Sequence, residues 1–373
     1  KTRKVCGRIT YDMLAAVIAT VIALVLHILD VLFGWNLPGK AFLWVLLLVM
    51  YGLMVCDWIG LKRMLIGAVA VVLTVGGAIG SLGVGWLSFC KNGDYQFADE
   101  GKASIYAGRR VMLIVPHQDD EVNLLGGVIE EYVRYGSEVY VVFATNGDYG
   151  EIPAVRYFEA LSVLGNLGVP EERVIFLGYG DQYAEAGPHL YNAPAGEVIT
   201  SHFGRTETYG AEFHSAYREG RVYTSDNFLD DIQSVILEYR PEILICSDYD
   251  AHSDHKALTL AFDKVMGRML REVPEYYPTV YKGYAYSTAW FAVDDYYAEN
   301  VASTLRATGE SGVDVYRWED RVRLPVDGGS LSRSLVGAPA YRSLLGHKSQ
   351  YAWFFAGKII NGDRVFWRRW VNS

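Results

Sequence analysis

The chain has 373 residues, of which 51% are hydrophobic, and its formal net charge is −9 at pH 7. An acidic chain does not favour nucleic acid as a partner, because the phosphates would repel it. Its four cysteines lack a C-x-x-C or comparable spacing, which argues against a disulfide framework and a cysteine metal site. The composition does not define the oligomeric state.

The first 90 residues contain three long apolar stretches, at about 13–33, 41–58 and 64–89. Each is near the ~20 residues that a helix needs to cross a bilayer. A cleaved signal peptide would be a single stretch, and buried core helices would have polar faces, which these stretches almost entirely lack. We therefore predict that residues 1–90 form a membrane anchor of three transmembrane helices, with the lipid bilayer as partner.

Basic residues around these stretches predict how the anchor is oriented. Four precede the first stretch, Lys62 and Arg63 separate the second from the third, and only Lys40 lies between the first and second. Because short cytoplasmic segments are enriched in Lys and Arg, the amino terminus is expected in the cytoplasm. Three crossings then make the chain a multi-pass cell-membrane protein whose residues 91–373 are extracytoplasmic.

Residues 91–373 alternate between strand-like apolar runs and helical patterns. The expected strands are Val111–Val115, Val139–Ala144, Val174–Leu177, Ile243–Cys246 and Thr279–Ser287. The expected helices are Val122–Tyr135, about Ala154–Leu167, Phe228–Tyr239 and one from Lys256. This alternation predicts an α/β domain with a Rossmann-like, doubly wound and mostly parallel sheet.

The first predicted strand runs into Pro116-His117-Gln118-Asp119-Asp120-Glu121. Ligands bind outside the carboxyl ends of strands in open α/β sheets, and a His with clustered carboxylates suits a divalent metal. An Asp that caps the following helix is the alternative. Capping uses one Asp, whereas three adjacent acids repel one another unless they share a cation or a proton. The segment therefore favours a metal site.

Later segments leave alternatives open. Asn146 and Asp148, which end the second strand, either line the site or form a simple Asn-Gly turn. The segment Tyr183–Asp226 is rich in aromatic residues and glycine and shows no sustained hydrophobic periodicity. It is either a lid or a wall on which sugar rings stack, or a surface excursion that is packed by its own aromatic side chains. We interpret its three histidines, His189, His202 and His214, as non-ligands. The tail Phe366–Trp370 is expected to pack against the domain or the membrane surface.

A second polar cluster follows the strand Ile243–Cys246 and contains His252 and His255, three residues apart where a loop meets a helix. Histidines at this spacing can face the same side. Two histidines and one carboxylate leave a coordination position open, as a catalytic zinc requires.

The two clusters together resemble the PIG-L/LmbE-like zinc-dependent N-acetylglucosaminyl deacetylases. That family usually has A-H-P-D-D-E followed by H-x-x-H, whereas this chain has Pro116 and Gln118 at positions that supply no ligand. The resemblance covers residues 108–265 well and implies that residues 91–373 are a deacetylase domain. The implied metal ligands, for Zn²⁺ or another divalent ion, are His117, Asp120 and His255.

The resemblance also implies roles for other residues. Asp119 would be the general base, and a protonated His252 would face the reacting carbonyl. Substrate contacts would come from Arg156, Asp181 and His347. The expected function is zinc-dependent removal of an N-acetyl group from an amino sugar or glycan of the N-acetylglucosamine type, with release of acetate. Another metal-dependent amide or ester hydrolase, or a non-catalytic sugar-binding membrane protein, is the alternative.

Overall fold

The computed structural model describes residues 17–26, 28, 47, 101–150, 152–182, 189–249, 252–285, 320, 322–326, 339–350 and 365–369. The chain divides into two compact units, residues 1–90 with 332–337, and residues 91–331 with 338–373. In the first unit, residues 17–26 are helical, and Ala23 and Leu47 are buried with Ala19 packed against them.

The predicted membrane spans fall mostly outside the described residues. Of the first stretch only 17–26 and 28 are described, of the second only Leu47, and of the third none. Among the described residues, no helix has both the length and the apolar character that a membrane crossing requires. The three-span anchor therefore stays a prediction.

The second unit is built on a sheet that has seven strands within the described residues, in the order β3-β2-β1-β4-β5-β7-β6. The strands are β1 (Arg110–Val115), β2 (Glu138–Thr145), β3 (Val174–Tyr179), β4 (Ile243–Ser247), β5 (Thr279–Gly283), β6 (Val322–Arg323) and β7 (Val365–Arg369). The first five are parallel, while β7 runs antiparallel to both β5 and β6. The predicted α/β class with a mostly parallel, Rossmann-like sheet is confirmed.

Two hydrophobic cores flank this sheet, as the near-continuous apolar strands require. In β1, Val111, Leu113 and Val115 belong to one core. Met112 and Ile114 belong to the other, because successive side chains of a strand point to opposite faces. All five are fully buried, so β1 is covered on both sides.

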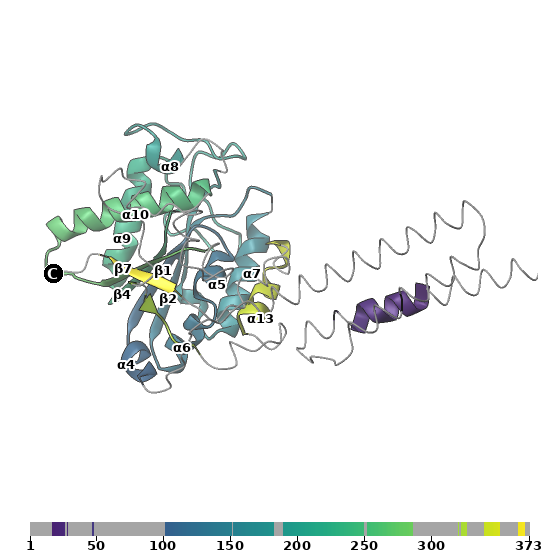
Figure 1. Ribbon diagram of the computed structural model, residues 1–373. Helices are drawn as coiled ribbons and strands as arrows, with labels where there is room; N and C mark the ends of the chain where they lie inside the picture. The colour runs from purple at the N-terminus through teal and green to yellow at the C-terminus, as the bar shows by residue number, and fades with distance from the viewer. Residues whose placement is uncertain are drawn as a thin grey trace, which may run out of the picture. The chain divides into compact units, whose positions relative to one another are not determined.

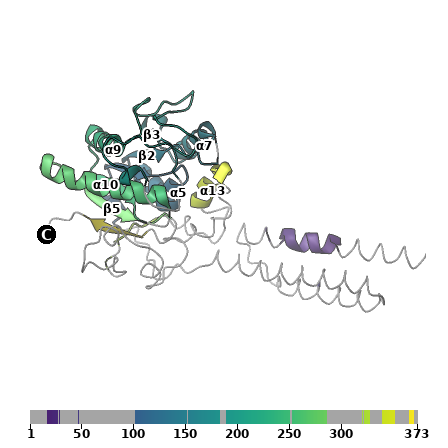
Figure 2. The same ribbon diagram turned by 90° about the horizontal axis from the view of Figure 1, so that it is seen from above.

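Helices cover both faces of the sheet (Figure 1 and Figure 2). One face carries α8 (His189–Asn192), α9 (Ser225–Tyr239) and α10 (Ser253–Glu272). The other carries α5 (Asp120–Leu125), α6 (Val128–Arg134), α7 (Pro153–Asn166) and α13 (Pro339–Gly346). The same unit also contains α4 (Lys102–Tyr106) and the 3₁₀ turns η1 (Glu171–Arg173) and η4 (Lys348–Gln350).

Three predicted helices differ from the structure, and one of these is Phe228–Tyr239, because α9 begins three residues earlier at Ser225. The expected single helix Val122–Tyr135 is two helices, because the chain turns at Gly126 and Gly127, and Gly127 has a φ of +86°. The helix expected from Lys256 begins at Ser253, so His252 is its N-cap and His255 lies in its first turn.

The structure describes parts of two segments for which the sequence left alternatives open, Tyr183–Asp226 and the tail Phe366–Trp370. The described part of Tyr183–Asp226 contains the short helix α8 and two isolated bridges, Glu207 with Val222 and Ala211 with His214. The tail forms β7, with Phe366 and Trp367 buried, which confirms that it packs against the domain.

The strand order determines where a ligand would bind. From β1 the chain proceeds outward through β2 to β3, and β4 and β5 then lie on the other side of β1. The order therefore reverses between β1 and β4, and loops leaving such a switch point diverge to opposite faces of the sheet and leave a crevice. The two predicted polar clusters follow these two strands.

Candidate metal centre

The loops after β1 and β4 bring three imidazoles together. The ring centroid of His117 is 4.6 Å from that of His252 and 5.3 Å from that of His255, and the latter two are 5.0 Å apart. His117 and His255 are buried, while the His252 side chain is 21% exposed. The predicted meeting of the two sequence clusters is therefore present in the fold.

Asp120 lies between two of these rings. Its Oδ2 is 3.2 Å from Nδ1 of His117 and 3.1 Å from Nε2 of His255. Neighbouring ligands of a tetrahedral zinc with bonds of ~2.0–2.1 Å are about 3.3 Å apart, so both spacings fit such an ion. Asp120 Oδ1 is buried and has no hydrogen-bond partner within the described part of the chain, as expected of a metal-ligating carboxylate. The donor set His117, Asp120 and His255 fits a divalent metal.

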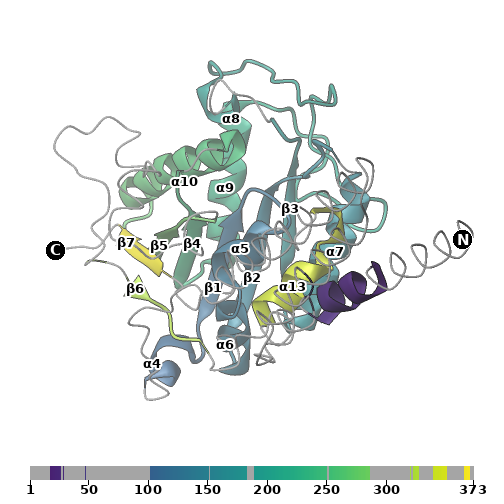
Figure 3. The same ribbon diagram turned by 45° about the vertical axis from the view of Figure 1, so that its right-hand side comes forward.

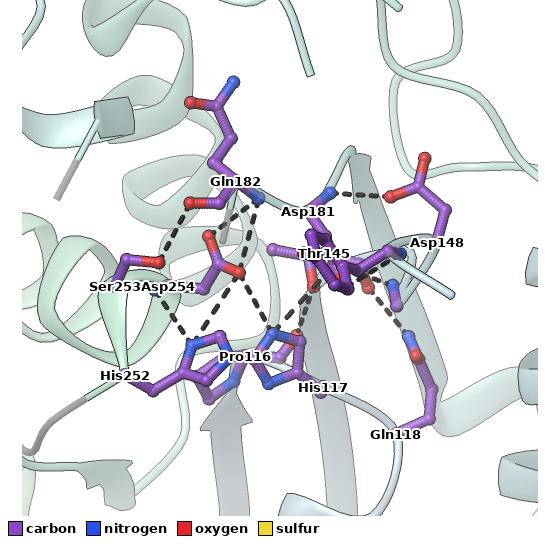
Figure 4. Close-up of polar contacts among 12 residues, drawn as sticks. Pro116, His117, Gln118, Thr145, Asp148, Asp181, Gln182, His252, Ser253 and Asp254 are labelled. Carbon is purple, nitrogen blue, oxygen red and sulfur yellow. Dashed lines mark hydrogen bonds and ion pairs between the residues drawn. The ribbon is translucent and has the colours of Figure 1, made fainter. Parts of the chain in front are cut away.

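Two other groupings share His117. His117, His252 and His255 have ring nitrogens within 4.8 Å of one another, and so do ligand atoms of His117, Asp181 and Asp254. In the second grouping Nε2 of His117 lies 3.2 Å from Asp254 Oδ2 and 3.9 Å from Asp181 Oδ1 (Figure 4). Metal-bound histidines usually donate their other N–H to a carboxylate. We therefore interpret Asp254 and Asp181 as the outer layer that orients His117.

Carboxylates also control the charge of His117. Burial lowers its pKa, but the neighbouring Asp181, Asp120 and Asp254 outweigh burial and raise the pKa to about 10. A proton held between these carboxylates performs the neutralising role that a metal ion would take over. Metal binding to this set is thus expected to release a proton.

His252 differs from the prediction in its charge. Its Nδ1 accepts the backbone N–H of Asp254 at 3.2 Å, so the ring proton is on Nε2. Burial, together with the charges of His117 and His255, lowers the pKa of His252 to about 2. His252 is therefore a neutral Nε2–H donor and not the protonated imidazole that the family resemblance suggested.

Asp119 occupies a strained backbone position at the N-cap of α5. Its φ of 150° and ψ of −22° lie in a region that residues other than glycine rarely adopt. Its Oδ1 is 3.3 Å from Nη2 of Arg156. Burial and the adjacent Asp120 raise the pKa of Asp119 to about 6, although Arg156 opposes this. Strained residues with shifted pKa values are typical of functional sites.

The predicted substrate residues Arg156 and Asp181 are buried at the edge of the centre. Besides Asp119, Arg156 donates to the carbonyls of Gln118 and Gly147, at 2.8 and 3.2 Å. Asp181 accepts the backbone N–H of Gly147 at 3.0 Å and that of Tyr149 at 3.3 Å. These hydrogen bonds fix both groups before any substrate binds, and their contact with a sugar stays a prediction.

The Asn146–Asp148 turn supports this edge. Asp148 accepts the backbone N–H of Asp181 at 2.7 Å and the hydroxyl of Tyr209, which contributes to holding the start of the loop after β3 (Figure 4). Asn146 donates to the carbonyls of Gly178 and Tyr209. Both side chains are buried, so the turn is more than an exposed Asn-Gly turn and acts as a support for Asp181.

His347, the third predicted substrate residue, lies behind Asp119. It is fully buried, and its Nε2 is 2.6 Å from Oε1 of Glu121. The other oxygen of Glu121 accepts the backbone N–H of Asp119 at 2.9 Å. Its family-derived role as a substrate contact stays a prediction.

Three residues of the site were not predicted from the sequence: Asp254, Glu121 and Gln182. Asp254 accepts the backbone N–H of Gln182 at 3.1 Å, and Ser253 donates to the Gln182 carbonyl at 2.9 Å (Figure 4). The signal for Asp254 and Glu121 was present, because each is an acid inside a polar cluster directly after a strand. Gln182 acts through its backbone, which sequence patterns do not reveal.

Gln118 stands where the related family has proline. Its side-chain amide donates to the carbonyl of Thr145 at 2.7 Å, and its own carbonyl accepts from Arg156. The backbone amide of Thr145 in turn donates to Pro116. These bonds tie the segment to the end of β2, so a hydrogen bond supplies the rigidity that a proline ring would otherwise give.

Fold and site together define an α/β protein with a metal-competent centre at the switch point of its parallel sheet. Residues 112–266 match the model of the PIG-L family, described as GlcNAc-PI de-N-acetylase. The matched residues begin in β1 and end in α10, so they contain both polar clusters. Residues 112–266 are therefore similar to the PIG-L family.

Several relatives are 1D-myo-inositol 2-acetamido-2-deoxy-alpha-D-glucopyranoside deacetylases. The protein from Mycobacterium sp. (strain KMS) is 26% identical over 181 residues, which are 46% of this chain and 54% of that protein. The one from Rhodococcus jostii (strain RHA1) is 29% identical over 154 residues, 39% of this chain and 49% of that protein. The chain thus spans about half the length of these relatives.

The solved structures that the chain matches include a deacetylase–teicoplanin complex from the teicoplanin biosynthesis pathway. It has a TM-score of 0.37 and 16% identity, and the match covers 66% of this chain and 90% of that one. The N,N'-diacetylchitobiose deacetylase from Pyrococcus horikoshii has a TM-score of 0.34 and 17% identity, covering 57% and 70%.

Proposed function

We propose that the chain is a metal-dependent hydrolase that removes the N-acetyl group from an N-acetylated amino sugar or glycan. The observation that carries the proposal is the set His117, Asp120 and His255 with a second carboxylate, Asp119, directly beside it. The PIG-L match and the relatives, which are named as deacetylases of an acetamido sugar, support the substrate class.

The proposed metal is zinc, held by His117, Asp120 and His255. When bound, zinc would lower the pKa of a coordinated water towards ~7 and polarise the amide carbonyl. Two nitrogen ligands and one carboxylate leave a coordination position open, which suits a catalytic more than a structural zinc.

The chain's own residues would carry the proton transfers. Asp119 accepts the proton of the attacking water as the water oxygen bonds to the acetamide carbon. The same carboxyl group returns that proton to the nitrogen as the carbon–nitrogen bond breaks, which yields acetate and a free amine. Arg156, 3.3 Å from Asp119, keeps the carboxylate oriented through this cycle.

His252 would stabilise the negative charge that develops on the carbonyl oxygen. Its Nδ1 accepts the backbone N–H of Asp254, which places the ring proton on Nε2, and we infer that this N–H donates to the oxygen. A neutral donor fixed at a helix N-cap needs no reorganisation during the reaction, and such preorganised donors contribute strongly to amide hydrolysis.

The most direct test is acetate release by the full-length chain from N-acetylhexosamines and short N-acetylated glycans. We expect zinc-dependent release that a chelator abolishes and added zinc restores. Asp119→Asn should abolish release while the protein still binds zinc, and Asp226→Asn, at an exposed acid in the first turn of α9, should behave as the wild type. Acetate release that persists in Asp119→Asn would refute the mechanism.

The same assay separates the two rival functions. Turnover of simple amides or esters without a preference for acetamido sugars would favour a different hydrolase on the same metal centre. Zinc content and tight sugar binding without any turnover would favour a non-catalytic binding protein, although every residue assigned to the metal and the proton transfers is present.

The proposal includes a membrane anchor at residues 1–90 and an extracytoplasmic catalytic domain. It rests on the three apolar stretches and the distribution of Lys and Arg around them. The protein should remain in the membrane fraction after an alkaline wash, and external protease should cleave the domain in intact spheroplasts. Protection of the domain until the cells are lysed would contradict the orientation.

A further inference from the structure

Glu121 joins two parts of the site that are distant in sequence. It is fully buried in the first turn of α5, and its two carboxylate oxygens have different partners. Oε2 accepts the backbone N–H of Asp119 at 2.9 Å, while Oε1 lies 2.6 Å from Nε2 of His347. The Glu121 carboxylate therefore connects the proposed base to His347, which lies 226 positions after Glu121 in the sequence.

Asp119 needs such support because its backbone is strained. A non-glycine residue at a φ of 150° is unfavourable by about 1–3 kcal/mol and persists only where its surroundings enforce it. On its carbonyl side Asp119 accepts the N–H groups of Val122 and Asn123, at 3.1 and 3.0 Å. On its N–H side, Glu121 is the partner that the described residues provide. The carboxylate of Glu121 thus fixes the half of Asp119 that helix α5 does not.

His347 is itself held from both sides. It follows α13, which lies beside α5 and α7 (Figure 3). Two residues later, Ser349 donates its backbone N–H and its hydroxyl to Glu159 of α7, at 3.0 and 2.7 Å. The segment His347–Gln350 is therefore docked through two buried carboxylates, one of which contacts the proposed base.

We propose that Glu121 and His347 are positioning residues for the deacetylation: His347 orients the Glu121 carboxylate, and Glu121 holds Asp119 in its strained, productive conformation. This inference rests on the proposed function of Asp119 as the base. His347 is 0% exposed and its Nε2 is directed at Glu121, so it is placed to act through that carboxylate.

The kinetic test compares two substitutions that differ in which ring nitrogen they imitate. The amide nitrogen of His347→Gln can reach the place of Nε2 and should retain most of kcat. The shorter His347→Asn cannot reach Glu121, so kcat should fall about 10- to 100-fold, as for other outer-shell groups. KM should stay within about twofold, because the substrate contacts are intact. Zinc stoichiometry should not change.

A double-mutant cycle tests whether the two residues act as one unit. If His347 acts through Glu121, Glu121→Ala with His347→Asn should be no slower than Glu121→Ala alone. Lys102→Met is the matched control, because Lys102 and Glu131 form another buried pair, 3.3 Å apart, on α4 and α6. Lys102→Met should lower the stability of the fold, while its kcat stays within about twofold of the wild-type value.

Hydrogen exchange supplies a readout that does not depend on turnover. Amides of a peptide spanning 116–125 should exchange faster in His347→Asn than in the wild type, in His347→Gln or in Lys102→Met. If the wild type releases no acetate, the proposed function fails while the exchange result still decides whether the contact restrains Asp119. Unchanged exchange and kcat in His347→Asn, a rise in KM alone, or loss of zinc would each overturn the positioning role.

Discussion

Substitution of Asp254 by Asn tests whether the outer layer of carboxylates controls metal binding. Asp254 is buried and accepts hydrogen bonds from two directions, from the backbone of Gln182 at 3.1 Å and from Nε2 of His117 at 3.2 Å. An Asn offers one acceptor oxygen and one NH₂ group, so it can satisfy only one of these donors. The backbone N–H of Gln182 cannot become an acceptor, and the change therefore falls on His117.

To accept the new NH₂ group, Nε2 of His117 must lose its proton, and the neutral ring then carries the proton on Nδ1. That nitrogen is the one that lies 3.2 Å from Asp120 and would bind the metal. Zinc must displace this proton, so we expect its affinity to fall about 10- to 100-fold, which equals about 1.4–2.7 kcal/mol. Competition with a chromophoric chelator, using the full-length chain at fixed pH, measures this change.

The control for this substitution is Asp226→Asn. Asp226 occupies the same place in α9 that Asp254 has in α10, two residues after the N-cap, but it is exposed. Both substitutions remove a carboxylate from a helix N-terminus, a loss of about 0.3–1 kcal/mol of stability, and only one faces His117. Equal zinc affinities of Asp254→Asn and Asp226→Asn would refute this reasoning.

Three further predictions concern other parts of the domain. Gly147→Ala and Gly196→Ala each add a Cβ at a residue with positive φ, which costs about 1–2 kcal/mol of strain. At position 147 the new Cβ would also come within 2.5 Å of Arg156 Cζ, whereas nothing lies within 4 Å of the new Cβ at position 196. Acetate release should therefore be lost in Gly147→Ala and kept in Gly196→Ala. Asp263→Asn removes the carboxylate that Lys282 and Arg369 share, so the free energy of unfolding in chemical denaturation should fall by about 3–5 kcal/mol. Arg369→Met keeps the 3.2 Å ion pair between Asp263 and Lys282, so it should lower the free energy of unfolding clearly less. Burial raises the pKa of Cys246 to about 12, so iodoacetamide at pH 8 should modify this thiol only in denaturant, as peptide mass mapping can determine; rapid labelling of the folded chain would contradict the burial.

The meeting of the two polar clusters was predictable because it depends on strand order and little else. Val111–Val115 and Ile243–Cys246 are apolar enough to be central parallel strands, and neighbouring parallel strands end at the same edge of a sheet. Any His or Asp directly after such a strand is brought to that edge. The order of the strands therefore predicts that His117, Asp120, His252 and His255 lie at the same edge.

The charge of His252 and the break at Gly126 were not predictable on the same basis. The helix pattern of Val122–Tyr135 continues across Gly126 and Gly127, so apolar spacing alone does not show the turn. The family resemblance implies a positive charge on His252, whereas its N-cap position makes Nδ1 an acceptor. Both errors concern backbone geometry, which a side-chain pattern records only indirectly.

The contact between His347 and Glu121 shows a different limit. The two residues are 226 positions apart, and α13 reaches α5 only after the chain has completed the parallel part of the sheet. A pairing this distant has no periodic signal. In the sequence, Glu121 and His347 belong to separate motifs, and only the fold shows that they are in contact.

Four buried carboxylates of the centre, all except that of Asp119, share one property that explains how they tolerate one another. Each accepts at least one backbone N–H: Asp120 from His117, Glu121 from Asp119, Asp254 from Gln182, and Asp181 from Gly147 and Tyr149. Backbone donors cannot rotate away, so the chain itself fixes the orientation of these carboxylates. Their mutual repulsion is then built into the folded state, and it is relieved only by the few cations the site contains and by any that it binds. A site preorganised in this way selects a cation mainly through the negative charge of its carboxylates. A neutralising substitution such as Asp254→Asn should therefore weaken metal binding more than the same substitution at the surface.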